Sequence, residues 1–288
     1  MVYIVCVTRE ERKPSPIRKE KKIERQDNMF GLTDNEIAIR CPQVFNTDYS
    51  SARTEKYNQF NTSSVINALR GEGFEVTNAF AQNVRAGKVA SPHHKHCVRL
   101  THRDFLKTLK PEDERPEIVI VNSHDGQSSF RIMAGMFRIV CANGLIVSTE
   151  ETGSAKVRHQ GEFNTIESVI DSALVVAEQA KESYELIERM KSQNLTDKEQ
   201  KEFAERAAKI RLAFNKNAKV VNAQNLLIPH RHEDNIVPSL WNTYNVIQEN
   251  CIKGGQVVGS RILRPLNNIN QNIEVNRKLW KEATTLVA

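Results

Sequence analysis

Strand-like alternation of apolar and polar residues is concentrated in the first half of the chain. Residues 74–82 alternate in this way, and two further short apolar segments follow at 96–100 and 118–121. Turn-forming residues separate these segments, so they predict an antiparallel hairpin or meander. The run at 118–121 is continuously apolar, which is typical of a strand buried on both faces.

Helical periodicity dominates the second half. Residues 165–191 place apolar side chains at intervals of three and four, which is the pattern of an amphipathic helix. Thr196 and Glu199 have the spacing of a capping box, so a second helix is predicted to begin there. Further apolar periodicity predicts helices over 63–69, 241–251 and 273–280.

These elements predict an α+β fold, in which an antiparallel β-meander is packed with helices and the C-terminal half is mainly helical. A capping-box pair, Thr33 and Glu36, predicts a short helix near the start of the folded region. We expect one α+β domain over 29–288, with a mixed β/α core over 29–160 and a helical portion over 161–288. Residues 1–28 are highly charged and contain few apolar side chains, so we expect a disordered basic tail there.

The segment 122–144 (NSHDGQSSFRIMAGMFRIVCANG) contains the residues that look least like core residues. Its apolar positions recur at three and four, which predicts a helix over 128–142. On such a helix Arg131 and Arg138 are two turns apart and share one side, where Gly135 would allow close approach of a phosphate. The alternative is a continuous strand interrupted at Gly135, because several neighbouring residues are β-branched.

The charge of the chain narrows the class of partner. It has 41 Lys and Arg against 35 Asp and Glu, a net charge of +6 and a pI near 9.0, which favours polyanions over cations as binding partners.

Five cysteines without a CxxC pair argue against a disulfide framework and for a cytoplasmic location. No segment reaches the roughly 18 apolar residues of a membrane span, so we expect no membrane association.

Candidate catalytic and metal-binding residues form no established pattern. His93, His94 and His96 are close in sequence, but no HxxxH or CxxC pair would fix two metal ligands locally. Residues 123–125 (SHD) carry the side chains of a catalytic triad in consecutive positions, which cannot form a relay by themselves. GxSxG, Walker A and GxGxxG signatures are absent. We therefore expect no catalytic residue, metal or cofactor, and a binding protein rather than an enzyme.

Cations and aromatic side chains together predict a nucleic-acid interface. Arginine makes forked contacts to phosphate, and aromatic rings stack on unpaired bases. The residues that we expect to bind nucleic acid are Arg131, Arg138, Arg99, His96, Arg158, His159, Tyr57 and Arg53. The alternative for Arg131 and Arg138 is pairing with carboxylates inside the domain.

Short motifs along the chain carry a family resemblance. In order they are PQVF (42–45), GFEVTNAFAQNVR (73–85), KHCVRL (95–100), NSHDGQSSFR (122–131), GMFRIVCANGL (135–145), VRHQG (157–161) and LWNTYNVIQENCIKGG (240–255). On these motifs the chain resembles a phage/plasmid-like domain family of unknown function, found in proteins of phages, plasmids and integrated elements. The resemblance implies a mobile-element protein and assigns no catalytic residue.

Three functions fit these features. The first is a homo-oligomeric mobile-element protein that binds nucleic acid, with single-stranded DNA favoured, for binding or annealing during recombination or replication. The second is a counter-defence protein that binds and inhibits a host protein. The third is a metal-dependent nuclease built on His124, Asp125, His96 and His159. The charge and the arginines favour the first function.

Overall fold

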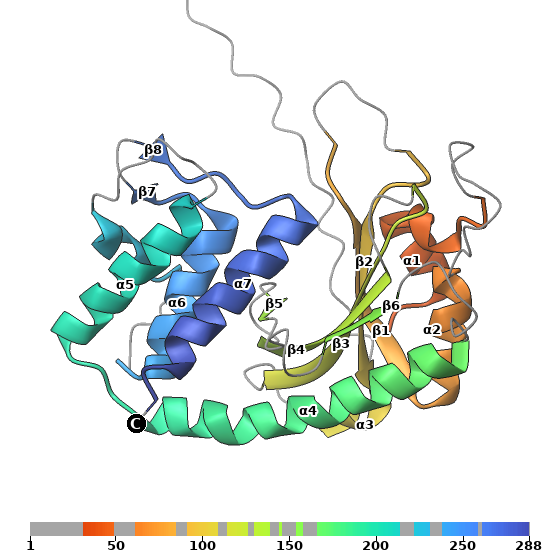
Figure 1. Cartoon of the computed structure of the whole chain (residues 1–288), viewed down its shortest axis with the longest axis horizontal. Coiled ribbons are helices and arrows are strands. Elements are labelled where there is room, and N and C mark those ends of the chain that lie inside the picture. The colour runs from red at the N-terminus through yellow and green to blue at the C-terminus, as the bar shows by residue number, and fades with distance from the viewer. Residues whose placement is uncertain are drawn as a thin grey trace, which may run out of the picture.

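The structure, a computed structural model, describes most of the chain (Figure 1). The described residues are 31–48, 61–84, 91–108, 114–125, 130–138, 144–145, 154–157, 166–213, 222–230, 238–258 and 261–287, and some of them are described by their backbone alone. The predicted basic tail over 1–28 lies outside these ranges. Among the helices within them, none has both the length and the apolar content that a membrane span requires.

An antiparallel meander forms the first half of the fold. β1 (Phe74–Ala81), β2 (His96–His102), β3 (Glu114–Asn122) and β4 (Phe130–Arg138) pair in chain order, each antiparallel to the one before. Two short strands, β5 (Gly144–Leu145) and β6 (Ser154–Val157), both pair with β4. Among the described strands, β1 therefore lies at an edge of the sheet.

The fourth strand occupies a segment whose sequence predicts a helix. The prediction of a helix over 128–142 is wrong, because the backbone of β4 is extended and pairs along its length with β3. Ile132 and Met133 are buried in two different clusters, one on each face of the sheet. A strand buried on both faces has apolar residues at consecutive positions, and these can imitate helical spacing. Positions seven apart in a strand lie on opposite faces, so the prediction that positions 131 and 138 share one side is also wrong.

Short helices flank the meander. α1 (Asp34–Arg40) begins at the predicted capping box of Thr33 and Glu36 and is followed by the 3-10 turn η1 (Pro42–Phe45). α2 (Thr62–Gly71) buries the apolar side that the sequence predicts, and α3 (Arg103–Thr108) follows β2. Between α2 and β1 the chain turns at Gly73, whose φ of +89° lies in the region that favours glycine.

The C-terminal half is built mainly from α4 (Ile166–Ser192), α5 (Asp197–Leu212), α6 (Leu240–Lys253) and α7 (Ile269–Thr284). α5 begins at the predicted capping box of Thr196 and Glu199. The 3-10 turn η2 (Ala223–Leu227) and a small hairpin of β7 (Val257–Val258) and β8 (Arg261–Ile262) accompany these helices. The predicted α+β fold, with its antiparallel meander and mainly helical C-terminal half, is confirmed.

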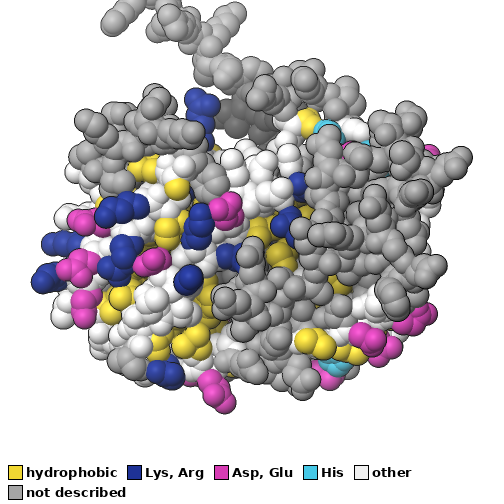
Figure 2. All heavy atoms as spheres, viewed as in Figure 1, with side chains coloured by type: hydrophobic (Ala, Val, Ile, Leu, Met, Phe, Trp, Pro, Cys, Tyr) yellow, Lys and Arg dark blue, Asp and Glu magenta, His cyan; other side chains and the backbone are white. Residues whose placement is uncertain are grey.

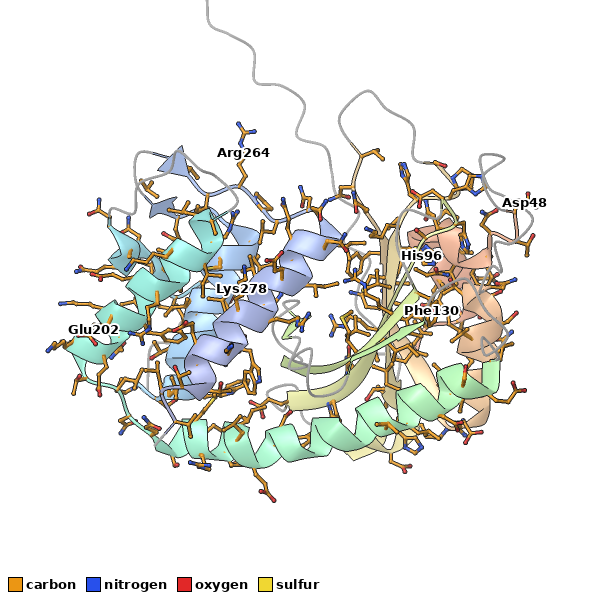
Figure 3. All side chains as sticks on the ribbon, in the orientation of Figure 1. Asp48, His96, Phe130, Glu202, Arg264 and Lys278 are labelled. Atoms are coloured by element: carbon orange, nitrogen blue, oxygen red, sulfur yellow. The ribbon has the colours of Figure 1, made fainter. Side chains whose placement is uncertain are left out.

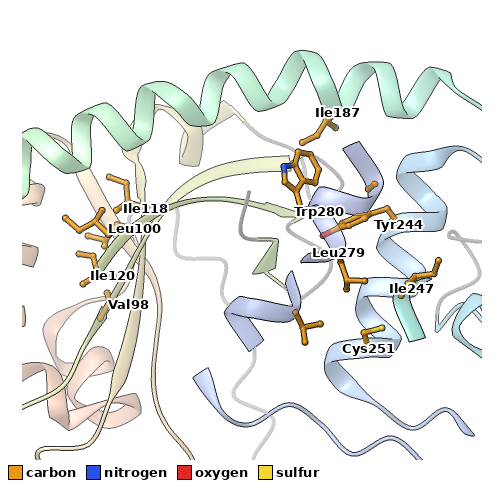
Figure 4. Close-up of a cluster of buried hydrophobic side chains, with 14 of the residues drawn as sticks. Val98, Leu100, Ile118, Ile120, Ile187, Tyr244, Ile247, Cys251, Leu279 and Trp280 are labelled. Atoms are coloured by element: carbon orange, nitrogen blue, oxygen red, sulfur yellow. The ribbon is translucent and has the colours of Figure 1, made fainter. Parts of the chain in front are cut away.

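α4 is the element that both halves share. In Figure 1 it runs beneath the sheet and beneath the group of α5, α6 and α7, and it contacts β3, β4 and α6. One cluster of buried side chains therefore extends from the sheet into the helices. Figure 4 shows Leu100 and Ile120 of the sheet in this cluster, together with Ile187 of α4, Tyr244 of α6 and Trp280 of α7.

The sheet is covered on both faces. One face contributes Val98, Leu100, Ile118 and Ile120 to the main core. The opposite face carries a smaller cluster, in which side chains of β2, β3 and β4 pack against Ile269 and Ile273 of α7; its sheet residues are Cys97, Val119, Val121 and Met133. The prediction that 118–121 is buried on both faces is therefore confirmed, and α7 is the helix that covers the second face.

A buried carboxylate connects the sheet to the helical half. Glu114 stands at the start of β3 and is 5% exposed. Its Oε1 accepts a hydrogen bond from the indole Nε1 of Trp241 on α6, and its Oε2 accepts one from Nζ of Lys191 on α4, both at 2.7 Å. The backbone carbonyl of Glu114 also accepts a bond from the Tyr184 hydroxyl at 2.9 Å. Because a buried carboxylate without partners is costly, these bonds favour one arrangement of β3, α4 and α6.

We expect the substitution Glu114→Gln to destabilise the protein. Glutamine keeps one acceptor oxygen but replaces the other with an NH₂ donor, so Trp241 and Lys191 cannot both be satisfied. Urea denaturation should show a loss of about 1–3 kcal/mol in the free energy of unfolding. Glu188→Gln is the control, because Glu188 also accepts from Lys191, at 2.8 Å, but is exposed; its cost should stay below about 0.5 kcal/mol. Equal effects of the two substitutions would contradict the role of the buried carboxylate.

Candidate nucleic-acid interface

One row of residues crosses the sheet face that α7 covers. The strand register aligns Phe80 of β1 with Cys97 of β2, Val121 of β3 and Arg131 of β4. Directly opposed residues in antiparallel strands point to the same face. Cys97 and Val121, in the middle of the row, are buried against α7, whereas Phe80 and Arg131 at its ends are not fully buried. The row therefore has an aromatic end and a cationic end.

Cations from three elements meet where α7 borders the sheet. Arg131 lies on β4, Lys95 directly precedes β2, and Arg277 lies on α7. Asn270, Ile273 and Arg277 are separated by three and four residues, so they occupy one side of α7. Because Ile273 packs on the sheet, this side of α7 faces the sheet. Figure 2 shows several Lys and Arg side chains over α7 and along its border with the sheet.

Arg131 interacts electrostatically with each of the other two cations. Burial and the charge of Arg277 both lower the pKa of Arg131. Burial and the charge of Arg131 lower the pKa of Lys95, while Asp125 has the opposite effect. The Arg131 guanidinium donates a hydrogen bond to Asn270 Oδ1 at 2.5 Å, which holds it beside α7. Repulsion between partly buried cations is unfavourable, and a bound anion would relieve it.

The N-terminal end of α7 adds positive potential at the same place. Asn268 caps the helix by accepting the N–H of Gln271 at 3.1 Å, and the first turn contains no acidic residue. α1 and α5, in contrast, carry acidic residues in their first turns. A helix has a partial positive charge at its N-terminus, and Arg131 is bonded to Asn270 in this first turn. The helix and the cations together favour an anion here.

Arg99 shares this sheet face but forms a buried ion pair. Its Nε lies 2.5 Å from Glu117 Oε2, and Arg115 Nη2 lies 2.7 Å from Glu117 Oε1. Thr77 also donates to Glu117 Oε1, at 2.9 Å. Burial opposes ionisation of Glu117, but the two arginines outweigh it and lower the pKa of the carboxyl. Arg99 is therefore neutralised by a carboxylate inside the domain and does not belong to the proposed interface.

His96 lies on the opposite face of the sheet, on the side of α1 and α2 (Figure 3). Its Nδ1–H donates to the carbonyl of His94 at 3.2 Å, so its Nε2 accepts from the Thr62 hydroxyl at 2.8 Å. Thr62 in turn accepts from the Asn122 amide at 2.9 Å. Burial lowers the pKa of His96 to about 4. A buried neutral ring cannot neutralise a phosphate, so His96 also stays outside the interface.

His124 and Asp125, two residues of the hypothetical metal-dependent nuclease site, follow β3. His124 is buried; its Nε2 donates to the Gln43 carbonyl at 3.0 Å, and its ring lies 5.1 Å from that of His96. Across the described ranges, no group of three or more His, Cys, Asp or Glu side chains is placed to hold a metal ion. His159, the remaining member of that hypothesis, lies outside the described residues.

Comparison with known proteins places the chain in a family. Residues 50–280 match the family described as a domain of unknown function (DUF932). The UPF0380 proteins YfjQ and YafZ of Escherichia coli (strain K12) are each 35% identical to this chain, over 261 and 262 residues that cover 89% of the chain and 92% of each relative. The chain therefore belongs to the DUF932 family. No solved structure matches it.

The structure changes the set of candidate residues. Arg53, Tyr57, Arg158 and His159 lie outside the described residues, and Arg138 is described by its backbone alone. The residues that the structure adds to Arg131 are Lys95, Arg277 and Phe80. Alternate residues of a strand point to one face, so the predicted strand at 96–100, extended by one residue, would have put Lys95 on the same face as Arg99. No sequence pattern marks Arg277, because only the packing of α7 brings it to the sheet.

Protonation of His96 should destabilise the protein in acid. Its pKa is about 4 in the folded protein and 6.5 ordinarily, so the unfolded chain binds the proton more tightly. The contribution of neutral His96 to the free energy of unfolding is fully present above pH 6.5 and is lost as the pH falls through about 4. This contribution amounts to about 3 kcal/mol. In His96→Gln, the free energy of unfolding measured in urea should fall less steeply across this range. His230→Gln, at an exposed position, should keep the wild-type slope, and an unchanged slope in His96→Gln would contradict the assignment.

Proposed function

We propose that this chain binds nucleic acid, with single-stranded DNA favoured, at the sheet face beside α7. The observation that carries the proposal is the convergence of Lys95, Arg131 and Arg277 along the border between the sheet and the N-terminal half and middle of α7. Phosphate oxygens are the acceptors that arginine and a helix N-terminus stabilise best. The net charge of +6 attracts polyanions generally.

The family resemblance gives this binding a context. The motifs quoted above resemble those of phage and plasmid proteins, so we propose a mobile-element protein that binds or anneals single strands during recombination or replication. Such a role needs no catalytic group, because backbone capture and base stacking supply the affinity. We propose that the protein acts as a homo-oligomer in the cytoplasm, since cooperative assembly along the strand is common among proteins of this kind.

Neutralising the cationic cluster should weaken DNA binding and its dependence on salt. For a fluorescently labelled oligothymidylate, Arg131→Gln, Arg277→Gln and Lys95→Gln should each weaken binding several-fold at low salt. Each lost phosphate contact should also reduce the slope of log K against log salt by about 0.7. Fluorescence anisotropy at several salt concentrations measures both quantities. Thermal unfolding should remain close to wild type, because the side chains are replaced by polar ones of similar size.

Lys278→Gln is the matched control for Arg277→Gln. Lys278 is the next residue on α7, it pairs with Glu274 at 2.7 Å, and Figure 3 shows it on this helix. Its removal changes the net charge by the same single unit, so less than a twofold effect is expected. Equal weakening by the two substitutions would mean that only overall charge matters. Absence of any binding at low salt, or binding that does not depend on salt, would overturn the proposed function.

A host protein as partner is the second candidate. Val257 and Ile262 are register partners in the β7–β8 hairpin and are 42% and 66% exposed, and the exposed Ile228 follows η2, which contacts β7. Exposed apolar side chains that gather in one place favour a protein partner. A counter-defence role predicts that a host protein co-purifies after nuclease treatment and is lost in the variant Val257→Ser/Ile262→Ser. Retention of the same protein by that variant would contradict this surface.

A further inference from the structure

Phe80 has an unusual position for a large aromatic side chain. It lies on the edge strand β1 and is 40% exposed. Among the aromatic residues whose side chains the structure describes, it is the only exposed one. A single exposed apolar side chain is ordinary by itself. The significance of Phe80 comes from the residues that share its face of the sheet.

The strand register puts Phe80 on the same face as the cationic cluster. Phe80 is aligned with Cys97, and its neighbour Ala79 points to the other face, where it is buried in the main core. α7 covers the middle of the Phe80 face through contacts with β2, β3 and β4, and β1 contributes no residue to that cluster. Phe80 therefore remains accessible because α7 does not extend over the edge strand.

The spacing between Phe80 and Arg131 suits a single strand. They are three strands apart in one row, which corresponds to roughly 14 Å at the usual separation of paired strands. A ring at one end of such a row and cations at the other provide the two contacts that single-strand binding proteins combine, base stacking and phosphate neutralisation. A duplex has its bases paired and stacked internally and offers no free base face to a ring.

We propose that Phe80 is a base-stacking residue and that the ligand of this interface is a strand with unpaired bases. This inference rests on the proposed function, because the cations must first hold the phosphates. It goes further by naming the residue that selects single strands over duplexes and over other polyanions. Phe80 determines the preference for bases, and Lys95, Arg131 and Arg277 determine the affinity for the backbone.

The test compares two ligands with the same number of phosphates. One is an oligothymidylate of about 12 nucleotides, and the other is an abasic oligonucleotide of equal length. Wild-type protein should bind the oligothymidylate about 5- to 100-fold more tightly than the abasic strand. Phe80→Leu should reduce that ratio toward one and leave the affinity for the abasic strand unchanged. Phe80→Trp should restore the ratio, because stacking needs an aromatic ring.

Controls separate stacking from a general loss of structure. Ile39→Ala removes another exposed apolar side chain, on α1, and should leave the ratio at its wild-type value; thermal unfolding of all variants checks the fold. A wild-type ratio in Phe80→Leu, or equal weakening of both ligands, would overturn the stacking role and leave the cationic interface in place. Wild-type protein that binds both ligands equally would also overturn it. Wild-type protein that binds neither ligand would overturn the proposed function itself.

Discussion

The buried carboxylate of Glu114 is the interaction on which the arrangement of this protein most depends. It stands at the start of a central strand and accepts hydrogen bonds from Trp241 on α6 and Lys191 on α4. The carboxylate needs both donors because it is removed from water, so the sheet and the helical half have a preferred relative position. α7 packs on α6 and on the sheet, and Arg277 reaches the border with the sheet only in that position. The candidate interface is therefore a consequence of how the two halves pack.

The two faces of the sheet have different chemistry for a physical reason. The face toward α2 and α4 belongs to the main core, where His96 is neutral and hydrogen-bonded and the Glu114 carboxylate has both of its oxygens bonded to Trp241 and Lys191. The face toward α7 is covered only in part, so its charged groups can reach a ligand. Within it, Arg99 is neutralised by Glu117, whereas Arg131 is bonded to the neutral amide of Asn270. An arginine whose neighbours include other cations has electrostatic reason to take an anionic ligand.

Local sequence signals predicted the parts of the fold that local physics controls. Helices begin at both predicted capping boxes, Thr33/Glu36 and Thr196/Glu199. The hydrogen bonds of a capping box join residues three apart, so the local sequence is enough to predict them. The same reasoning failed for β4, whose two buried faces give apolar residues in consecutive positions. Of the residues that the sequence predicts for the interface, Arg131 lies in the cationic cluster. Lys95 and Arg277 were not predicted, and Arg277 is brought to Arg131 only by tertiary packing. Phe80 was missed because its importance comes from the register of four strands, which no single segment encodes.

A single strand bound on the sheet face beside α7 would protect the backbone that it covers. Backbone hydrogen exchange, measured with and without saturating oligothymidylate, tests this most directly because it reports where the ligand lies without altering any side chain. We expect slower exchange at the end of β1 over 78–84, before β2 over 91–96, and in the first turns of α7 over 268–274. Slowing confined to η2, to the β7–β8 hairpin or to the C-terminal half of α4 would contradict it.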